Sequence, residues 1–107
     1  MVEQMSKYHA VPTIVGDICF DSKKEAARYQ ELKLLERAGE IIRLELQPKF
    51  EIVVNNVKIC DYLGDFRYID AHNMETVTED TKGVKTPVYR LKKKLVKAIY
   101  GIDILET

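Results

Sequence analysis

The sequence predicts a single domain of the mixed α/β (α+β) class, with a mostly antiparallel mixed sheet flanked by two main helices at about residues 22–38 and 87–100. The first observation behind this class is the element order, which reads hairpin, helix, several antiparallel strands, helix and short strand. The second is the length of 107 residues, which fits one domain, divided into a polar tail over residues 1–11 and a folded domain over residues 12–107. The third is the composition, because 46% hydrophobic residues can build a core.

The composition also excludes several classes of protein. No run of about 18 apolar residues is present, so the sequence predicts no membrane span. The first fifteen residues lack the basic-then-apolar order of a signal peptide. Cys19 and Cys60 both lie in apolar stretches, and we interpret them as buried thiols of a cytosolic protein. Two cysteines and two histidines far apart do not match a zinc site.

The first elements are a short hairpin and a helix. Residues 13–15 and 18–20 flank Gly16-Asp17, a pair that suits a tight hairpin turn. Ser22 and Glu25 match the capping box that begins a helix, and Gly39 is typical of the residue after a helix end. The apolar residues between them recur at helical spacing, so the sequence predicts a helix over residues 22–38.

Strands fill the middle of the chain and a second helix follows. Strand-like runs occupy residues 41–46, 49–54, 57–60, 62–69 and 75–82, with turns at 55–56 and 71–73. Gly64 lies inside one of these runs and predicts a bulge or a close approach of the backbone. Thr86 and Pro87 suit the start of a helix and Gly101 its end. Residues 102–105 read as a short last strand.

Three charged residues stand out as a candidate catalytic group. Asp80 and Lys82 are two apart on a strand and therefore share a face. A hairpin through residues 70–74 brings Asp65 beside them. Two adjacent carboxylates repel each other, and a hard divalent cation such as Mg²⁺ removes that penalty. A neighbouring lysine can act on water or on a phosphodiester. The alternative is a surface ion pair worth less than about 1 kcal/mol.

Six stretches in order strengthen the catalytic interpretation. They are FDSKKEA (20–26), AGEI (38–41), LQPKF (46–50), DFRY (65–68), EDTKG (79–83) and YRLKKK (89–94). In this order the chain resembles the PD-(D/E)XK nuclease superfamily, whose core is a helix, an antiparallel hairpin carrying Asp…(Asp/Glu)-x-Lys, and a following helix. More narrowly, it resembles a phage- and prophage-associated family of domains of unknown function in that superfamily, and loosely the phage Holliday-junction resolvases of the endonuclease I type. The resemblance implies a restriction-endonuclease-like core.

The resemblance also assigns roles to individual residues. Asp65 and Asp80 correspond to metal ligands, the Thr81 carbonyl to a third ligand, and Lys82 to the residue that acts on water or phosphate. Glu25 corresponds to an acidic residue on the first helix, although its place in the capping box competes with that role. Glu79 is expected on the opposite sheet face. Two further positions are candidate accessory residues, Gln47 beside the site or at a plain turn, and Lys92.

The basic residues are concentrated near the C-terminus. Seven lysines and arginines occur between Lys82 and Lys97 without an acidic residue, although 17 basic and 17 acidic residues balance over the whole chain. On the second helix, Val88, Leu91, Leu95 and Ile99 form the expected buried stripe. A separate stripe, together with the preceding lysine, is expected to follow nucleic-acid phosphates, the alternative being a solvated face: Lys85, Arg90, Lys93, Lys94 and Lys97.

Taken together, these features predict a Mg²⁺-dependent endonuclease that hydrolyses DNA phosphodiester bonds, with Mn²⁺ able to replace Mg²⁺. By resemblance, branched DNA of phage recombination or replication is the candidate substrate. A homodimer is expected because a small domain has little surface for recognition. Two alternatives remain open: an inactive nucleic-acid-binding module with the nuclease fold, and a phage structural or regulatory protein that binds other proteins.

Overall fold

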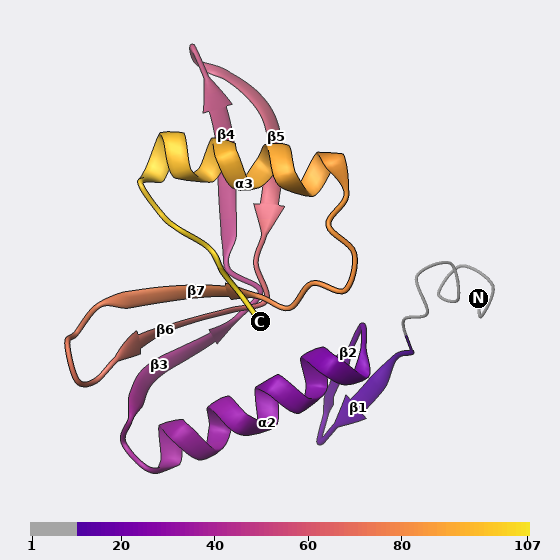
Figure 1. Ribbon diagram of the computed structural model, residues 1–107, viewed down its shortest axis with the longest axis vertical. Helices are drawn as coiled ribbons and strands as arrows, with labels where there is room; N and C mark the ends of the chain where they lie inside the picture. Colours follow the sequence, from indigo (N-terminus) through magenta and orange to yellow (C-terminus); the bar gives the residue numbers. More distant parts are fainter. Residues whose placement is uncertain (1–10) are drawn as a thin grey trace.

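The computed structural model describes residues 11–107, so most of the tail predicted over residues 1–11 lies outside the described residues. Two helices and eight strands follow each other along this part of the chain (Figure 1). The helix bounds confirm the prediction to within one residue. The elements are β1 (Thr13–Val15), β2 (Ile18–Phe20), α2 (Lys23–Arg37), β3 (Ile41–Leu46), β4 (Lys49–Val54), β5 (Val57–Leu63), β6 (Phe66–Asp70), β7 (Thr76–Asp80), α3 (Pro87–Tyr100) and β8 (Leu105–Glu106).

The strands form three sheets in the described part of the chain, which confirms a mixed, mostly antiparallel α+β fold. The largest sheet has the order β3-β6-β7-β8, and only its β7–β8 pair is parallel. β1 pairs with β2, and β4 pairs with β5, as separate antiparallel hairpins. Each helix therefore covers its own group of strands, whereas one continuous sheet between two helices was expected.

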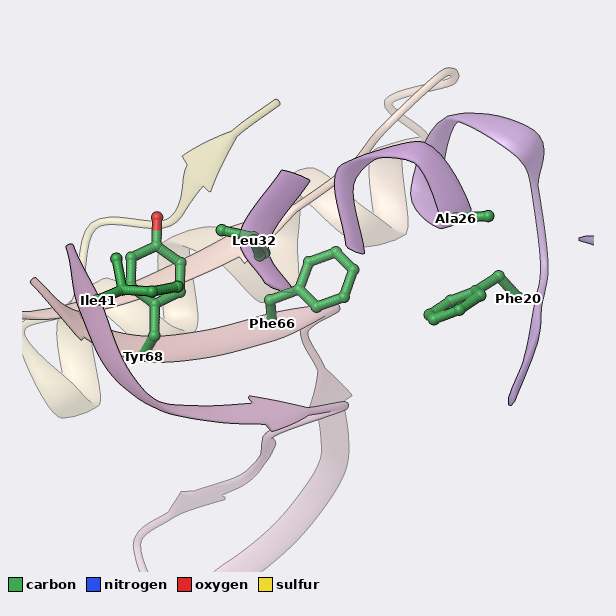
Figure 2. Close-up of a cluster of buried hydrophobic side chains, with 6 residues drawn as sticks. All are labelled: Phe20, Ala26, Leu32, Ile41, Phe66 and Tyr68. Carbon is green, nitrogen blue, oxygen red and sulfur yellow. The ribbon is translucent and has the colours of Figure 1, made fainter. Parts of the chain in front are cut away.

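Helix α2 packs on the four-stranded sheet and forms the first core. Ser22 begins the helix, since its Oγ accepts the Glu25 N–H at 3.1 Å, and Gly39 follows its end with a φ of 81°. Figure 2 shows the apolar side chains that meet here from the hairpin, the helix and the sheet. They are Phe20, Ala26, Leu32, Ile41, Phe66 and Tyr68.

Helix α3 lies across the β4–β5 hairpin and forms the second core (Figure 1). Thr86 caps its start, and Gly101 ends it with a φ of 70°. The two cores share no residue. The domain therefore has two halves, one built by α2, the β1–β2 hairpin and the four-stranded sheet, and the other by α3 and the β4–β5 hairpin. The second core consists of Phe50, Ile52, Tyr62, Tyr89, Val96 and Ile104.

The stripe expected to be buried on the second helix is largely wrong. Val88 is 62% exposed and Leu91 is 58% exposed, and Ile99 is also exposed, while Leu95 is half-buried. Tyr89 and Val96, seven residues apart, are buried instead. An amphipathic pattern does not reveal which of two neighbouring faces meets the sheet when an aromatic residue lies between them. The aromatic Tyr89 takes the buried position because Tyr62 and Ile104 complete the core around it.

The strand boundaries near Gly64 also differ from the prediction. Tyr62 and Leu63 belong to β5, and the break falls at Gly64 and Asp65 rather than before Tyr62. A Cβ at Gly64 would lie 3.3 Å from the Pro48 side chain, which confirms a close approach of the backbone. β7 ends at Asp80 and the last strand occupies residues 105–106 rather than 102–105. These shifts place Asp65 in the junction between the two halves.

Two further expectations can be compared with the fold. Cys19 is exposed, so the expectation of a buried thiol is wrong there, while Cys60 is partly buried, and both are free thiols. Cys19 lies on a two-stranded hairpin whose other face packs on α2, which leaves its own face open. Neither helix in residues 11–107 is long and apolar enough to cross a membrane.

Candidate functional site

The β6–β7 hairpin brings the two predicted aspartates together. Phe66 pairs with Glu79 in the last residue pair of the β6–β7 ladder at this end. The Asp65 N–H donates to the Glu79 carbonyl at 2.9 Å, one residue out of this register, as in a β-bulge. The hairpin therefore places Asp65 beside the end of β7, where Asp80 lies, as the sequence predicts.

The two oxygens of Asp80 have different surroundings. Its side chain is 1% exposed, and Oδ2 accepts a short hydrogen bond from the Tyr62 hydroxyl. Oδ1 is buried without a hydrogen-bond partner. The Lys82 ammonium lies 3.4 Å from Oδ1 as an ion pair, but not in hydrogen-bonding geometry. A buried carboxylate oxygen without a donor is costly, so its environment favours a further positively charged group.

Asp65 is held by the backbone of the motif itself. The Thr81 N–H donates to Asp65 Oδ2 at 2.6 Å, which fixes the carboxylate beside the chain end of β7. Burial raises the pKa of Asp65 to about 7, with further contributions from the nearby Asp80 and Glu25 carboxylates, against the lowering effect of the Thr81 N–H. Burial and the neighbouring carboxylates therefore disfavour the ionised form of Asp65.

Only half of the capping box forms at Glu25. Its backbone N–H donates to Ser22, but within residues 11–107 its carboxylate makes no hydrogen bond to the Ser22 N–H. The side chain is buried, and burial raises the pKa of Glu25, with added repulsion from Asp21 and Asp80. Its carboxylate is thus close enough to Asp21 and Asp80 for their negative charges to disfavour its ionised form.

Lys82 has a second contact besides its ion pair with Asp80. Its ammonium lies 4.7 Å from the centroid of the Tyr89 ring, a cation–π contact. The Tyr89 hydroxyl donates to Glu106 Oε2 at 2.7 Å, so the ring is itself held at the C-terminal strand. Lys24 donates to the Lys82 carbonyl at 3.5 Å from the start of α2.

A cavity of about 490 Å³ opens beside Asp65 and Lys82, and the buried Asp80 lies behind its lining rather than in it. Its lining joins the start of α2 to the end of the motif and includes Ser22, Lys24, Glu25, Asp65, Thr81 and Lys82. Gln47 lines a smaller cavity on the other side of Asp65, and its N–H donates to the Asp65 carbonyl at 2.9 Å. Gln47 therefore lies next to Asp65 and contacts it through the backbone, and its side-chain role stays a prediction.

The residues present fit one hard divalent cation held by few protein ligands. Asp65 and Asp80 offer carboxylate oxygens, one of them the partnerless Oδ1, and the Thr81 carbonyl is adjacent. Within residues 11–107 no group of three or more His, Cys, Asp or Glu side chains converges closely enough to hold a metal by itself. Mg²⁺ is commonly bound by one or two carboxylates together with water and substrate phosphate, so two carboxylates suffice.

A comparison with known protein families identifies the family of this chain. The family model described as a protein of unknown function (DUF1064) matches residues 5–104. The chain belongs to the DUF1064 family. No curated protein and no solved structure matches it. Family membership thus covers nearly the whole chain, the hairpin and the cavity included, and leaves the activity to be argued from the site.

Glu79 faces away from the cavity, as the alternation of the strand predicts. It is fully buried, and Arg28 donates to both of its oxygens at 2.8 and 2.7 Å. The Tyr68 hydroxyl adds a short third bond. Both oxygens of Glu79 are therefore satisfied, unlike those of Asp80. This family member thus places a structural carboxylate and a candidate functional one at neighbouring positions of β7.

The basic residues of α3 are less free than their sequence suggests. Glu106 pairs with Lys85 and Lys93 at 3.0 and 3.2 Å, and Asp103 pairs with Lys97 at 2.8 Å. The segment from Lys82 to Lys97 contains no acidic residue, yet part of its charge is neutralised because the C-terminal segment folds back beside it. In residues 11–107, Arg90 and Lys94 form no ion pair, which leaves them open to phosphates.

Lys92 does not contribute to the cavity. Its ammonium donates to the Asp61 carbonyl at 2.9 Å on β5, and it is absent from the lining of both cavities among the described residues. Sequence reasoning also missed two residues that contact the motif directly, Tyr62 and Tyr89. No local pattern marks them, since they come from a different strand and helix, and only the packing of the second core brings them to the site.

Proposed function

We propose that the protein is a Mg²⁺-dependent endonuclease of the PD-(D/E)XK type that hydrolyses DNA phosphodiester bonds, with Mn²⁺ able to replace Mg²⁺. The observation that carries the proposal is the pair Asp65 and Asp80, with the buried Asp80 Oδ1 lacking a hydrogen-bond partner. The order of helix, hairpin and helix along α2, β6–β7 and α3 supports it, because the nuclease core has the same order.

Each residue of the motif has a role in this proposal. Asp65 and Asp80 would hold the cation together with the Thr81 carbonyl. When bound, a divalent cation supplies Lewis-acid activation of water and of the scissile phosphate. Lys82 carries a positive charge beside Asp80, where it can orient the attacking water or stabilise the charge that develops on phosphate. Glu25 lines the same cavity as Asp65 and Lys82, where its carboxylate would accept a proton from the attacking water.

The shape and charge around the site support a polyanionic substrate. Lys24 and Lys82 line the cavity, and Arg90 and Lys94 on α3 form no ion pair within residues 11–107. Cations placed this way can contact successive phosphates of a nucleic acid. We extend the proposal to branched DNA in phage metabolism, to action in the bacterial cytoplasm and to a homodimer, all by resemblance to the endonuclease I type of resolvase.

The test is a cleavage assay on linear, nicked and four-way-junction DNA with Mg²⁺, Mn²⁺ or EDTA. We expect cleavage with either metal, none with EDTA, and loss of cleavage in Asp80→Asn and Lys82→Ala. Asp70→Asn is the matched control, because this aspartate lies at the far end of β6 and is expected to leave cleavage intact.

The outcomes separate the alternatives. Absence of cleavage of every substrate by the folded wild-type protein would refute the enzyme. DNA retention in a gel without cleavage would then favour the inactive binding module. Binding to none of the three DNA substrates would favour the structural or regulatory protein.

A further inference from the structure

The Asp80 carboxylate is asymmetric in a way that the motif alone does not explain. Oδ2 accepts the hydrogen bond from Tyr62, and Oδ1 has no hydrogen-bond donor. A carboxylate with neither oxygen fixed can rotate about its Cβ–Cγ bond and exchange the two. A donor on one oxygen therefore determines which oxygen remains for another ligand.

Tyr62 is well placed to supply that fixed donor. It is 3% exposed, pairs with Phe50 in the β4–β5 register, and lies 6.1 Å from the Phe50 ring and 6.4 Å from the Tyr89 ring, centroid to centroid. Packing on both sides restricts the ring to one position. Its hydroxyl group thus reaches from the second core to the end of β7, which belongs to the other half of the domain.

The neighbouring carboxylate provides an internal comparison. Glu79 also accepts a short bond from a buried tyrosine, Tyr68, but Arg28 occupies both of its oxygens as well. The result is a closed network with no oxygen left for a ligand. Asp80 receives only the tyrosine hydrogen bond, and its Oδ1 has the Lys82 ammonium at 3.4 Å without a hydrogen bond, so this oxygen keeps its acceptor capacity for a cation. The Tyr62 hydrogen bond can therefore orient Asp80 as a metal ligand, whereas the Tyr68 hydrogen bond completes a buried network around Glu79.

We propose that Tyr62 is a positioning residue, whose hydroxyl fixes the Asp80 carboxylate so that Oδ1 is directed to the divalent cation. This inference rests on the proposed function, because it assumes that a cation binds between Asp65 and Asp80. Partners that orient a metal ligand in this manner change metal affinity by about 10–100-fold when they are removed. Tyr62 itself touches neither the cation nor the substrate.

The experiment is calorimetric titration with Mn²⁺ in the absence of DNA. Tyr62→Phe removes only the hydroxyl, and we expect it to weaken Mn²⁺ binding at least tenfold. Tyr68→Phe is the matched control, since it removes an equally buried hydroxyl from the bond to Glu79. We expect its dissociation constant to remain within about twofold of the wild-type value. Circular dichroism verifies that all three proteins are folded.

Two results would overturn the inference while leaving the proposed function intact. One is an unchanged Mn²⁺ affinity in Tyr62→Phe, and the other is an equal loss in Tyr62→Phe and Tyr68→Phe, which would indicate general loosening. Wild-type protein that binds no Mn²⁺ would instead refute the metal site, and the inference with it. If Tyr62→Phe does not fold, Mn²⁺-loaded wild-type crystals decide: a cation on Oδ1 with Tyr62 on Oδ2 supports the inference, and a cation on Oδ2 contradicts it.

Discussion

Replacing Asp65 with asparagine should make the metal-free protein more stable at alkaline pH. The folded state holds the pKa of Asp65 at about 7, against an ordinary value of 3.8, because the carboxyl is buried beside Asp80 and Glu25. Below pH 3.8 the group is protonated in both states and has no effect. Between pH 3.8 and 7 the unfolded chain ionises first, so stability falls as the pH rises. Above pH 7 the loss is complete.

The size of the effect follows from the difference between these two pKa values. A difference of about three pH units corresponds to about 4 kcal/mol. Asp65 is only partly buried, and solvent screens its charge, so we take about half of this value. Asparagine has nearly the same shape, and its oxygen can still accept the Thr81 N–H. We therefore expect Asp65→Asn to gain about 2 kcal/mol at pH 8.

The assay is urea unfolding with EDTA at pH 8 and at pH 4. With a denaturant slope of about 2 kcal/mol per molar, the midpoint at pH 8 should rise by about 1 M. At pH 4 the two proteins should differ little. Mg²⁺ in place of EDTA should stabilise only the wild-type protein, because the variant loses a ligand. A variant that is less stable at pH 8, or equally shifted at both pH values, would refute the reasoning.

Three further predictions follow from the packing and the charges. Val96→Ala should cost about 2–3 kcal/mol in urea unfolding, since Val96 is fully buried, while Leu91→Ala should cost less than about 0.5 kcal/mol; equal losses would contradict the exposed stripe. Arg28→Met should cost about 3–5 kcal/mol, because it leaves a buried carboxylate with one donor, and a thermal midpoint at the wild-type value would contradict this. Lys94→Ala should lower the salt dependence of DNA binding by about one phosphate contact, more than Lys97→Ala, whose ammonium is already paired with an aspartate, and fluorescence anisotropy at several salt concentrations measures both.

The sequence was informative wherever the signal is local. The Ser22 and Thr86 caps and the glycines at 39 and 101 each act within one helical turn, and both helices are found where these residues predict them. The alternation along β7 correctly separated Asp80 from Glu79. The turn at residues 71–73 was enough to predict the hairpin that brings Asp65 to the end of β7. Such features need no knowledge of distant contacts.

The sequence was least informative where two distant segments decide the outcome. The buried face of α3 depends on Tyr62 and Ile104, which are far from it along the chain. Neutralisation of the lysines depends on the return of Glu106 beside α3. The hydroxyl that fixes Asp80 comes from β5. In each case the residues are visible in the sequence, but the residue that each one contacts is determined by tertiary packing.

The site also explains why a neutral chain can be proposed to act on DNA. Three of the acidic residues that balance the basic ones, Asp65, Asp80 and Glu25, are neighbours at the site and repel one another. A bound cation would offset this repulsion and make the cavity more attractive to phosphate. Net charge over 107 residues therefore says little about the field at the cavity, where Lys24 and Lys82 lie.

The central claim is that Asp65 and Asp80 hold one divalent cation between them. The most direct test is anomalous diffraction from crystals of the wild-type protein soaked in Mn²⁺. The account predicts one anomalous peak within roughly 2–2.5 Å of an oxygen of each aspartate, on the side of the cavity. A peak elsewhere only, or aspartates that remain too far apart to share an ion in the presence of Mn²⁺, would contradict it.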